Sequence, residues 1–265
     1  MPDPLSQSTY LTLCSVILMS HPFKGSPTLP FNTISNPSPI PEKEDIHKAL
    51  ASLPEPRKHY KWYYSTAPAA SEMDNPKESL HAFLRGYFYL KSADWEGNHP
   101  APLKAWEAKE LAKLPYYYVM PLSANMRQAV HISMKDEDPA TVSRQSARWL
   151  NDDDLAVYVQ EFGRNGFQGG LNWYRTATDP ANMKDVELFA GKKIDVPALF
   201  ISGKRDWGTY QEPGAVQRMG EVCSQFKGTV LVDDAGHWVQ QEQPEKVIEI
   251  VLKFLREVRI DSISY

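Results

Sequence analysis

The stretch IDVPALFISGKRDWGTYQEPGAVQRMGEVCSQFKGTVLVDDAGHWVQQE, residues 194–242, decides the fold. Val196–Ser202 is a short, nearly continuous apolar run that ends at Gly203, which is typical of a strand buried on both faces of a parallel sheet. A helical segment opens at Pro213, and a second apolar run, Thr229–Val232, follows it. Strand, helix and strand in this order predict an α/β fold with a mostly parallel sheet.

Two polar side chains follow the two predicted strands. Asp206 comes a few residues after the first strand and His237 comes after the second. Ligands and catalytic groups of open α/β sheets collect at the carboxyl edge of the strands, so we expect both side chains at that edge. A carboxylate bonded to one ring nitrogen holds a histidine in one tautomer and stabilises its imidazolium, as a general base requires. Taken singly, Asp206 reads equally well as a loop-capping carboxylate and His237 as an ordinary turn residue.

The order of Asp before His, with the nucleophile earlier in the chain, is that of α/β-hydrolases. Residues 236–242, G-H-W-V-Q-Q-E, and the stretch before them resemble the C-terminal half of the epoxide hydrolase branch of that superfamily. Farther upstream, Asn172-Trp173-Tyr174-Arg175 resembles the N-W-Y-R motif of that branch's cap domain. Tyr60, within H-Y-K-W-Y-Y at 59–64, falls where the second cap tyrosine of the family lies. The resemblance covers the chain from about Val16 onward.

The resemblance implies a partial α/β-hydrolase fold with an inserted helical cap domain, and it implies site residues. Asp206 and His237 would be the acid and base, while Tyr174 and Tyr60 would donate hydrogen bonds to the oxygen of an epoxide. It implies neither a metal nor another cofactor. Ordinary aromatic packing within the cap is the competing interpretation of both tyrosines.

The resemblance also implies a division into core and cap, and composition marks the connector between them. Residues 1–35 would hold a strand and connector of the hydrolase core, 36–185 the helical cap, and 186–265 the rest of the core with Asp206 and His237. The prolines of residues 24–41 mark the connector, because proline fixes φ and removes a donor. The apolar run Tyr10–Met19 lacks the basic flank and cleavage site of a signal peptide and is too short to span a bilayer, so it predicts a strand.

Apolar residues at helical spacing predict several helices. Asn75-Pro76 is a helix start, and Leu80, Phe83, Leu84, Tyr87 and Phe88 then repeat at three and four residues. The acids at 152–154 suit a helix N-terminus better than a metal site. Aromatic side chains of the cap imply a small apolar organic substrate; they include Trp62, Tyr63, Tyr116 and Trp173. Further helices are expected over Glu42–Leu53, Leu103–Leu114, Ser123–Met134 and Pro244–Val258, the last with Val247, Val251, Leu252 and Leu255 toward the sheet.

The composition is that of a globular protein, with 42% hydrophobic and 23% charged residues among 265. A net charge of −4 gives no electrostatic case for binding nucleic acid or an anionic membrane. Two cysteines cannot build a disulfide framework, and they indicate a reducing compartment, which we take as the cytoplasm.

The sequence contains no G-x-S-x-G or G-x-D-x-G, the glycine-flanked turn that carries the family's nucleophile. We therefore expect the chain to begin after its nucleophile elbow and to be inactive alone, as an incomplete or inactive form of an epoxide hydrolase-like enzyme. Sheet strands left with uncovered faces and edges would require a partner, for example in a homo-oligomer. Two alternatives stay open: a dehalogenase or esterase of the same fold, and a non-catalytic ligand-binding protein.

Overall fold

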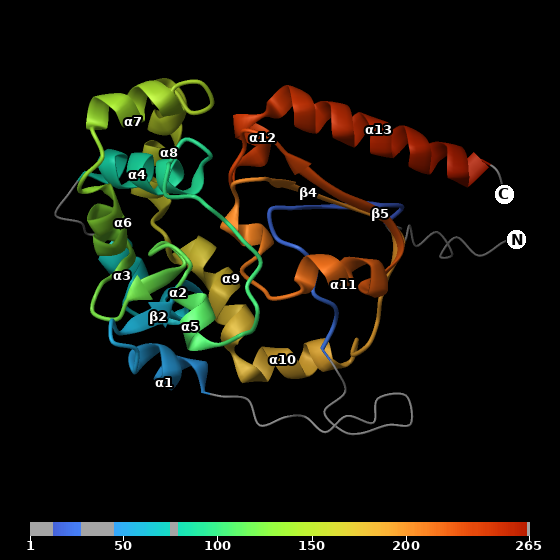
Figure 1. Cartoon of the computed structure of the whole chain (residues 1–265), viewed down its shortest axis with the longest axis horizontal. Coiled ribbons are helices and arrows are strands. Elements are labelled where there is room, and N and C mark those ends of the chain that lie inside the picture. Colours follow the sequence, from blue (N-terminus) through green and yellow to red (C-terminus); the bar gives the residue numbers. More distant parts are fainter. Residues whose placement is uncertain (1–12, 28–44, 75–78, 264–265) are drawn as a thin grey trace, which may run out of the picture.

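A computed structural model describes residues 13–27, 45–74 and 79–263, and it divides into a sheet half and a helical half (Figure 1). In the sheet half, the segment 194–242 forms two parallel strands joined by a helix, as its sequence predicts. The elements of this half are β1 (Val16–Met19), β4 (Ile194–Gly203), the short 3-10 helix η1 (Trp207–Thr209), α11 (Ala215–Val222), β5 (Cys223–Val232), α12 (Val239–Glu242) and α13 (Pro244–Ile263).

The sheet has the strand order β1-β4-β5 and is parallel throughout. Its centre is β4, whose side chains alternate between two cores. Leu199 and Ile201 face α13, whereas Ala198 and Phe200 face α11, and all four are buried. The two helices lie on opposite faces of the sheet (Figure 1). Coverage of both faces explains why Val196–Ser202 is an apolar run without alternation.

The helical half is the segment between β1 and β4, which supports the expected inserted cap. A single aromatic-rich core joins its helices, with Leu50, Leu90, Tyr118, Met120 and Leu155 almost fully buried. Its elements are α1 (Ile46–Ala51), β2 (Arg57–His59), α2 (Tyr60–Ser65), α3 (Ala69–Asp74), α4 (Leu80–Lys91), α5 (Ala108–Leu111), β3 (Val119–Pro121), α6 (Met126–Met134), α7 (Pro139–Ser146), α8 (Asp152–Asn165), α9 (Gln168–Thr178) and α10 (Pro180–Glu187).

Local capping explains where the cap helices begin. The Asn151 side chain accepts the Asp154 amide, so Asp152, Asp153 and Asp154 form the first turn of α8, where carboxylates oppose the positive end of the helix dipole. The acidic run is thus a helix start, as expected from the sequence. Asn125 makes a reciprocal capping box with Gln128 and begins α6.

Several sequence-based boundaries differ from the structure. The strand predicted over Tyr10–Met19 is described only as Val16–Met19, and its first three residues lie outside the described part. The helix predicted over Leu103–Leu114 is the single turn Ala108–Leu111. The helix start at Asn75-Pro76 also lies outside the described residues; the described part of α4 begins at Leu80, with Ser79 as its N-cap.

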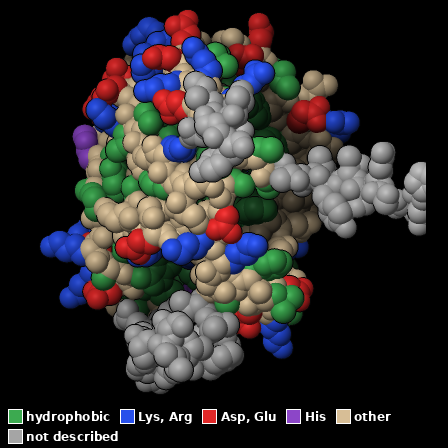
Figure 2. Space-filling view, turned by 90° about the vertical axis from the view of Figure 1, so that its right-hand side faces the viewer, with side chains coloured by type: hydrophobic (Ala, Val, Ile, Leu, Met, Phe, Trp, Pro, Cys, Tyr) green, Lys and Arg blue, Asp and Glu red, His purple; other side chains and the backbone are tan. Residues whose placement is uncertain are grey.

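The prediction for α13 is wrong at two positions. Leu252 and Leu255 are 48% and 45% exposed, whereas Val247, Phe254 and Val258 are buried in the sheet core and Val251 is partly buried against it. On the face of the molecule formed by the sheet half, charged side chains of both signs surround exposed hydrophobic ones (Figure 2). Within the described ranges, no helix is both long enough and apolar enough to cross a membrane.

Candidate active site

Asp206 lies at the carboxyl end of β4, where it caps η1. Its Oδ1 accepts the Gly208 amide at 2.7 Å, and its Oδ2 accepts the Ser202 hydroxyl at 3.2 Å. Thr209 in turn donates to the Ser202 hydroxyl oxygen at 2.7 Å. The Asp206 side chain is only 2% exposed. These donors fix the orientation of a buried carboxylate, which otherwise would be costly to desolvate.

His237 follows β5 and meets this carboxylate. Its Nδ1 lies 3.2 Å from both Oδ1 and Oδ2 of Asp206, so Nδ1 carries the bonded proton and Nε2 is left as the basic nitrogen. The loop is anchored on both sides of the ring: the His237 amide donates to the Lys91 carbonyl at 2.9 Å, and the Ser20 hydroxyl donates to the His237 carbonyl at 2.8 Å. The structure therefore brings Asp206 and His237 into contact, and their roles as acid and base stay a prediction.

Two glycines allow the close approach of backbones behind this pair. A Cβ on Gly236 would lie 2.5 Å from the Lys91 carbonyl oxygen and 2.7 Å from the Ala93 nitrogen. A Cβ on Gly203 would lie 2.2 Å from the carbonyl oxygens of Ala235 and Gly236. Both obstacles are backbone atoms, which cannot move aside as a flexible side chain can. The last residue of β4, the histidine loop and the end of α4 therefore pack at distances that only glycine permits.

Tyr60 and Tyr174 come together from two different cap helices. Tyr60 begins α2 and Tyr174 lies in α9, and their ring centroids are 5.7 Å apart in an edge-on arrangement. The Tyr60 hydroxyl lies 3.5 Å from Oε1 of Gln211, in the loop that follows Asp206. Burial raises the pKa of the Tyr60 phenol well above its usual value, and burial with nearby Tyr87 raises that of Tyr174. Both phenols therefore stay protonated and can donate.

A buried lysine links the tyrosines to the histidine loop. The Lys91 side chain is 5% exposed, and its Nζ lies 4.8 Å from the ring centroid of Tyr118 and 5.7 Å from that of Trp238. Tyr118 stacks edge-on against Tyr60 at 5.1 Å, and Trp238 adjoins His237 at 4.9 Å. Aromatic faces stabilise a cation at such distances. The site is thus a continuous aromatic cluster with one ammonium inside it.

The other cap aromatics differ in their exposure and in their hydrogen-bond partners. Trp173 is 77% exposed, which is inconsistent with a substrate-lining position. Tyr63 donates to Glu72 at 2.7 Å, so its hydroxyl has a partner within the cap. The Tyr64 ring lies closer to Tyr174 than the Tyr60 ring does, with ring centroids 4.9 Å apart. It donates to the Tyr87 hydroxyl at 3.4 Å, so its phenol has a partner within the cap.

Sequence reasoning missed the supporting groups of the site. Ser202 and Thr209, which orient Asp206, carry no motif of their own. Glu242 accepts three backbone amides around His237, and its place at the end of G-H-W-V-Q-Q-E was the one available signal. Among the described residues, no three metal-ligating side chains gather in one place.

An acid–histidine pair at the carboxyl ends of adjacent parallel strands, facing an inserted helical segment, defines part of an α/β-hydrolase. Solved structures that superpose on this one agree with that class. An epoxide hydrolase from an endophytic Streptomyces superposes with a TM-score of 0.64 at 22% identity, covering 93% of this chain and 61% of that one. Epoxide Hydrolase A from Mycobacterium thermoresistibile superposes at 0.57 with 26% identity, covering 92% and 62%.

Within the α/β-hydrolases, the chain is similar in sequence to curated epoxide hydrolases. Epoxide hydrolase B of Mycobacterium tuberculosis (strain ATCC 25618 / H37Rv) is 39% identical over 111 residues, which are 42% of this chain and 31% of the relative. Epoxide hydrolase A of the same strain is 43% identical over 107 residues, 40% of this chain and 32% of the relative. No family profile matches the chain.

The chain is therefore epoxide hydrolase-like, with a partial α/β-hydrolase fold and a helical cap. Its matched region spans about a third of the length of these two curated relatives.

Proposed function

We propose that this chain supplies the acid, the base and the epoxide-binding tyrosines of an epoxide hydrolase that acts on a small apolar epoxide. The observation that carries the proposal is the contact of His237 Nδ1 with both Asp206 oxygens, 3.2 Å each, on loops that also meet Tyr60. Domain limits of 1–35, 36–185 and 186–265 and a reducing, cytoplasmic location belong to the same proposal; the location is proposed because two cysteines cannot build a disulfide framework.

In the first step, a carboxylate attacks one epoxide carbon and the bond from that carbon to the ring oxygen breaks. The oxygen leaves as an alkoxide and takes a proton from Tyr60 or Tyr174, which gives an alkyl ester with a neighbouring hydroxyl. Because burial keeps both phenols protonated, both can stabilise the developing negative charge.

In the second step, Nε2 of His237 takes a proton from water while the hydroxide attacks the ester carbonyl carbon. The tetrahedral intermediate collapses, the diol leaves and the carboxylate is regenerated. Asp206 stabilises the imidazolium that forms. The imidazolium then gives its Nε2 proton to the tyrosinate, which restores the phenol. The tyrosine pair favours an epoxide over the substrates of a dehalogenase or an esterase, because a halide or an acyl ester does not need two phenol donors.

The attacking carboxylate is the part that this sequence does not provide in the expected form, because neither G-x-D-x-G nor G-x-S-x-G occurs in it. We infer that the 265-residue chain alone does not complete the cycle. The same observation favours the second candidate function, a non-catalytic protein that binds an apolar ligand at the aromatic cluster.

The deciding experiment extends the chain at its N-terminus with a segment that bears an elbow aspartate. In that enzyme, His237→Gln should accumulate the alkyl ester, because ring opening needs the carboxylate and tyrosines whereas ester hydrolysis needs the histidine. Mass spectrometry should find the protein heavier by the mass of the epoxide. Full turnover without an adduct would exclude His237 as the hydrolytic base.

The tyrosine roles are tested in the same enzyme. Tyr60→Phe and Tyr174→Phe should each slow alkylation about a hundredfold, roughly 3 kcal/mol for the loss of one oxyanion donor. The double variant should lose far more. Tyr63→Phe is the matched control, because the Tyr63 hydroxyl already donates to Glu72. If Tyr174→Phe leaves ring opening unchanged, a dehalogenase or an esterase becomes the better interpretation.

A further inference from the structure

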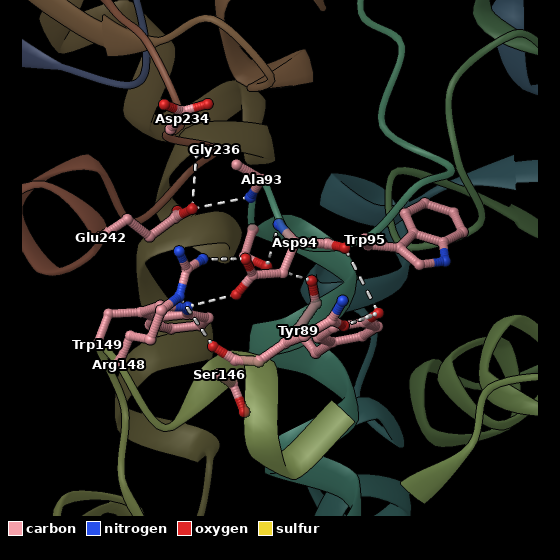
Figure 3. A network of polar contacts seen from close by, with 12 residues as sticks. Tyr89, Ala93, Asp94, Trp95, Ser146, Arg148, Trp149, Asp234, Gly236 and Glu242 are labelled. Carbon is pink, nitrogen blue, oxygen red and sulfur yellow. Dashed lines mark hydrogen bonds and ion pairs between the residues drawn. The ribbon is translucent and has the colours of Figure 1, made fainter. Parts of the chain in front are cut away.

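Glu242 ends α12 with its carboxylate buried against the histidine loop. Its Oε2 accepts the Gly236 amide at 2.9 Å and the Ala93 amide at 2.8 Å, and its Oε1 accepts the Trp238 amide at 3.0 Å. Figure 3 shows the first two bonds meeting at one carboxylate oxygen. Glu242 therefore holds the residues on either side of His237, and it ties both to the segment that follows α4.

Two more bonds join the same segments. The Trp238 indole donates to the Phe88 carbonyl at 2.9 Å, and the His237 amide donates to the Lys91 carbonyl at 2.9 Å. The last carbonyls of a helix have no partner within the helix and must be satisfied from outside. The histidine loop supplies these donors to α4, and Glu242 closes the arrangement from the other side by binding the Ala93 amide.

We propose that Glu242 is a positioning residue for His237: its carboxylate holds the loop so that Nδ1 faces Asp206. The proposal rests on the proposed function only in taking His237 as the base. The geometry requires a carboxylate, since three N–H donors converge and both oxygens accept. A glutamine would turn its NH₂ group toward one of these donors, so at least one bond would be lost.

The environment of Glu242 is consistent with a fixed role. Burial raises the pKa of the Glu242 carboxyl to about 7, although the amides of Ala93, Gly236 and Trp238 act to lower it. Asp94 also raises it, and that carboxylate is itself bonded to Arg148 and to the Trp149 indole (Figure 3). Two of the three bonds of this carboxylate are directed at the backbone on either side of His237 and the third at the segment after α4, so the carboxylate is well suited to holding that histidine in place.

The test uses the 265-residue chain as it is, labelled with ¹⁵N in its histidines. The His237 signals are identified by their loss in His237→Gln. In the unmodified chain, His237 should be the Nδ1–H tautomer, with a proton protected from exchange by Asp206. In Glu242→Gln this proton should exchange roughly tenfold faster or more, since a bond to a charged group is lost, and the tautomer preference should weaken. Glu249→Gln is the matched control, because Glu249 pairs with Lys246 on the surface of α13.

A folded Glu242→Gln variant whose His237 keeps the tautomer and exchange rate of the unmodified chain would overturn the proposal. If that variant does not fold, Glu242→Asp retains the charge but is too short to reach all three amides, and it should show the same loss. The unmodified chain gives an independent check: rapid exchange of the Gly236 and Trp238 amides would also overturn the proposal. None of these measurements depends on turnover, so a failed ester trap would refute the hydrolase proposal and leave the role of Glu242 standing.

Discussion

At the scale of single residues, Gly236 is where a change of one methyl group should disturb the site most. In Gly236→Ala the new Cβ would lie 2.5 Å from the Lys91 carbonyl oxygen, and the loop would have to move away from α4. Overpacking of this kind typically costs about 1–3 kcal/mol. We expect thermal unfolding at a lower temperature and loss of the protected Nδ1 proton of His237 in the NMR spectrum.

The control for this prediction is Gly220→Ala in α11, where a Cβ would meet nothing within 4 Å. Alanine in a helix interior is favoured over glycine by about 0.5–1 kcal/mol, so this variant should be slightly more stable and keep the His237 signal. Equal effects of the two substitutions would contradict the close approach at Gly236.

His59 should make the fold sensitive to acid. It is completely buried, and burial lowers its pKa from 6.5 to about 3, so the native state stays neutral where the unfolded chain binds a proton. Its contribution to stability is complete above pH 6.5 and is lost as the pH falls toward 3, at about 1.4 kcal/mol per pH unit. His59→Asn, which keeps a good N-cap for α2, should therefore lose less stability between pH 7.5 and pH 4.5.

Urea unfolding at the two pH values measures this difference. The asparagine also removes packing against Tyr60 and Trp62, which lowers stability at both pH values. The decrease in the free energy of unfolding from pH 7.5 to pH 4.5 is therefore compared within each protein. The control is His131→Asn, at an exposed position of α6. It should leave the decrease in the free energy of unfolding between the two pH values unchanged. If His59→Asn loses as much free energy of unfolding between pH 7.5 and pH 4.5 as the unmodified chain does, His59 is protonated in the native state and the prediction is wrong.

The residues of the acid–base pair were predictable because strand ends and chain order determine their place. Asp206 and His237 follow two apolar runs that form neighbouring strands, and parallel strands bring such positions to one edge. Ser202, Thr209 and Lys91 were not predictable, since their roles depend on contacts with other segments. Trp173, named among the cap aromatics, is exposed because neighbouring residues of a helix do not share a face, and Tyr174 is the one that faces the cap core.

At the scale of elements, α13 has more apolar positions than the sheet covers. Val247, Phe254 and Val258 reach the sheet core, whereas Ile248, Leu252 and Leu255 form a second stripe at helical spacing that is about half exposed. Phe254→Ala should cost about 3–5 kcal/mol, as for a buried aromatic residue. Leu252→Lys should change stability by roughly 0.5 kcal/mol or less, as at other surface positions. Urea unfolding of the two variants measures this difference. A large decrease in the free energy of unfolding of Leu252→Lys would place Leu252 in the core, as its sequence spacing suggested.

Elements with long buried stripes were predicted well, and short or polar ones were not. The strand at Val196–Ser202 and the helix at Leu80–Phe88 were found because burial requires their apolar patterns. The helices α7 and α10 were missed, since α7 buries only Val142 and Ser146, and none of the α10 side chains that the structure describes is buried. Their starts were nevertheless marked by Asp138-Pro139 and Asp179-Pro180, each a capping acid followed by proline.

At the scale of the whole molecule, the described sheet has three strands, with β1 and β5 at its edges. The two solved epoxide hydrolases are matched over 61% and 62% of their length, so they contain structure with no counterpart here. The proposed mechanism divides accordingly. In that proposal the chain would provide the base, the acid and the phenols, and no glycine-flanked elbow for the nucleophile occurs in its sequence.

The chain alone should therefore show no epoxide hydrolysis above the uncatalysed rate. His237 can activate water, but without an attacking carboxylate no ester forms for that water to cleave. Diol formation from a styrene-oxide-type epoxide is the measurement, with His237→Ala as the matched control. Equal, background rates in both proteins are expected. Turnover that His237→Ala abolishes would mean that another group of this chain opens the ring. The group would have to be a carboxylate, because the His237-activated water cleaves an ester, and peptide mass spectrometry of the adduct that accumulates in His237→Ala would identify it.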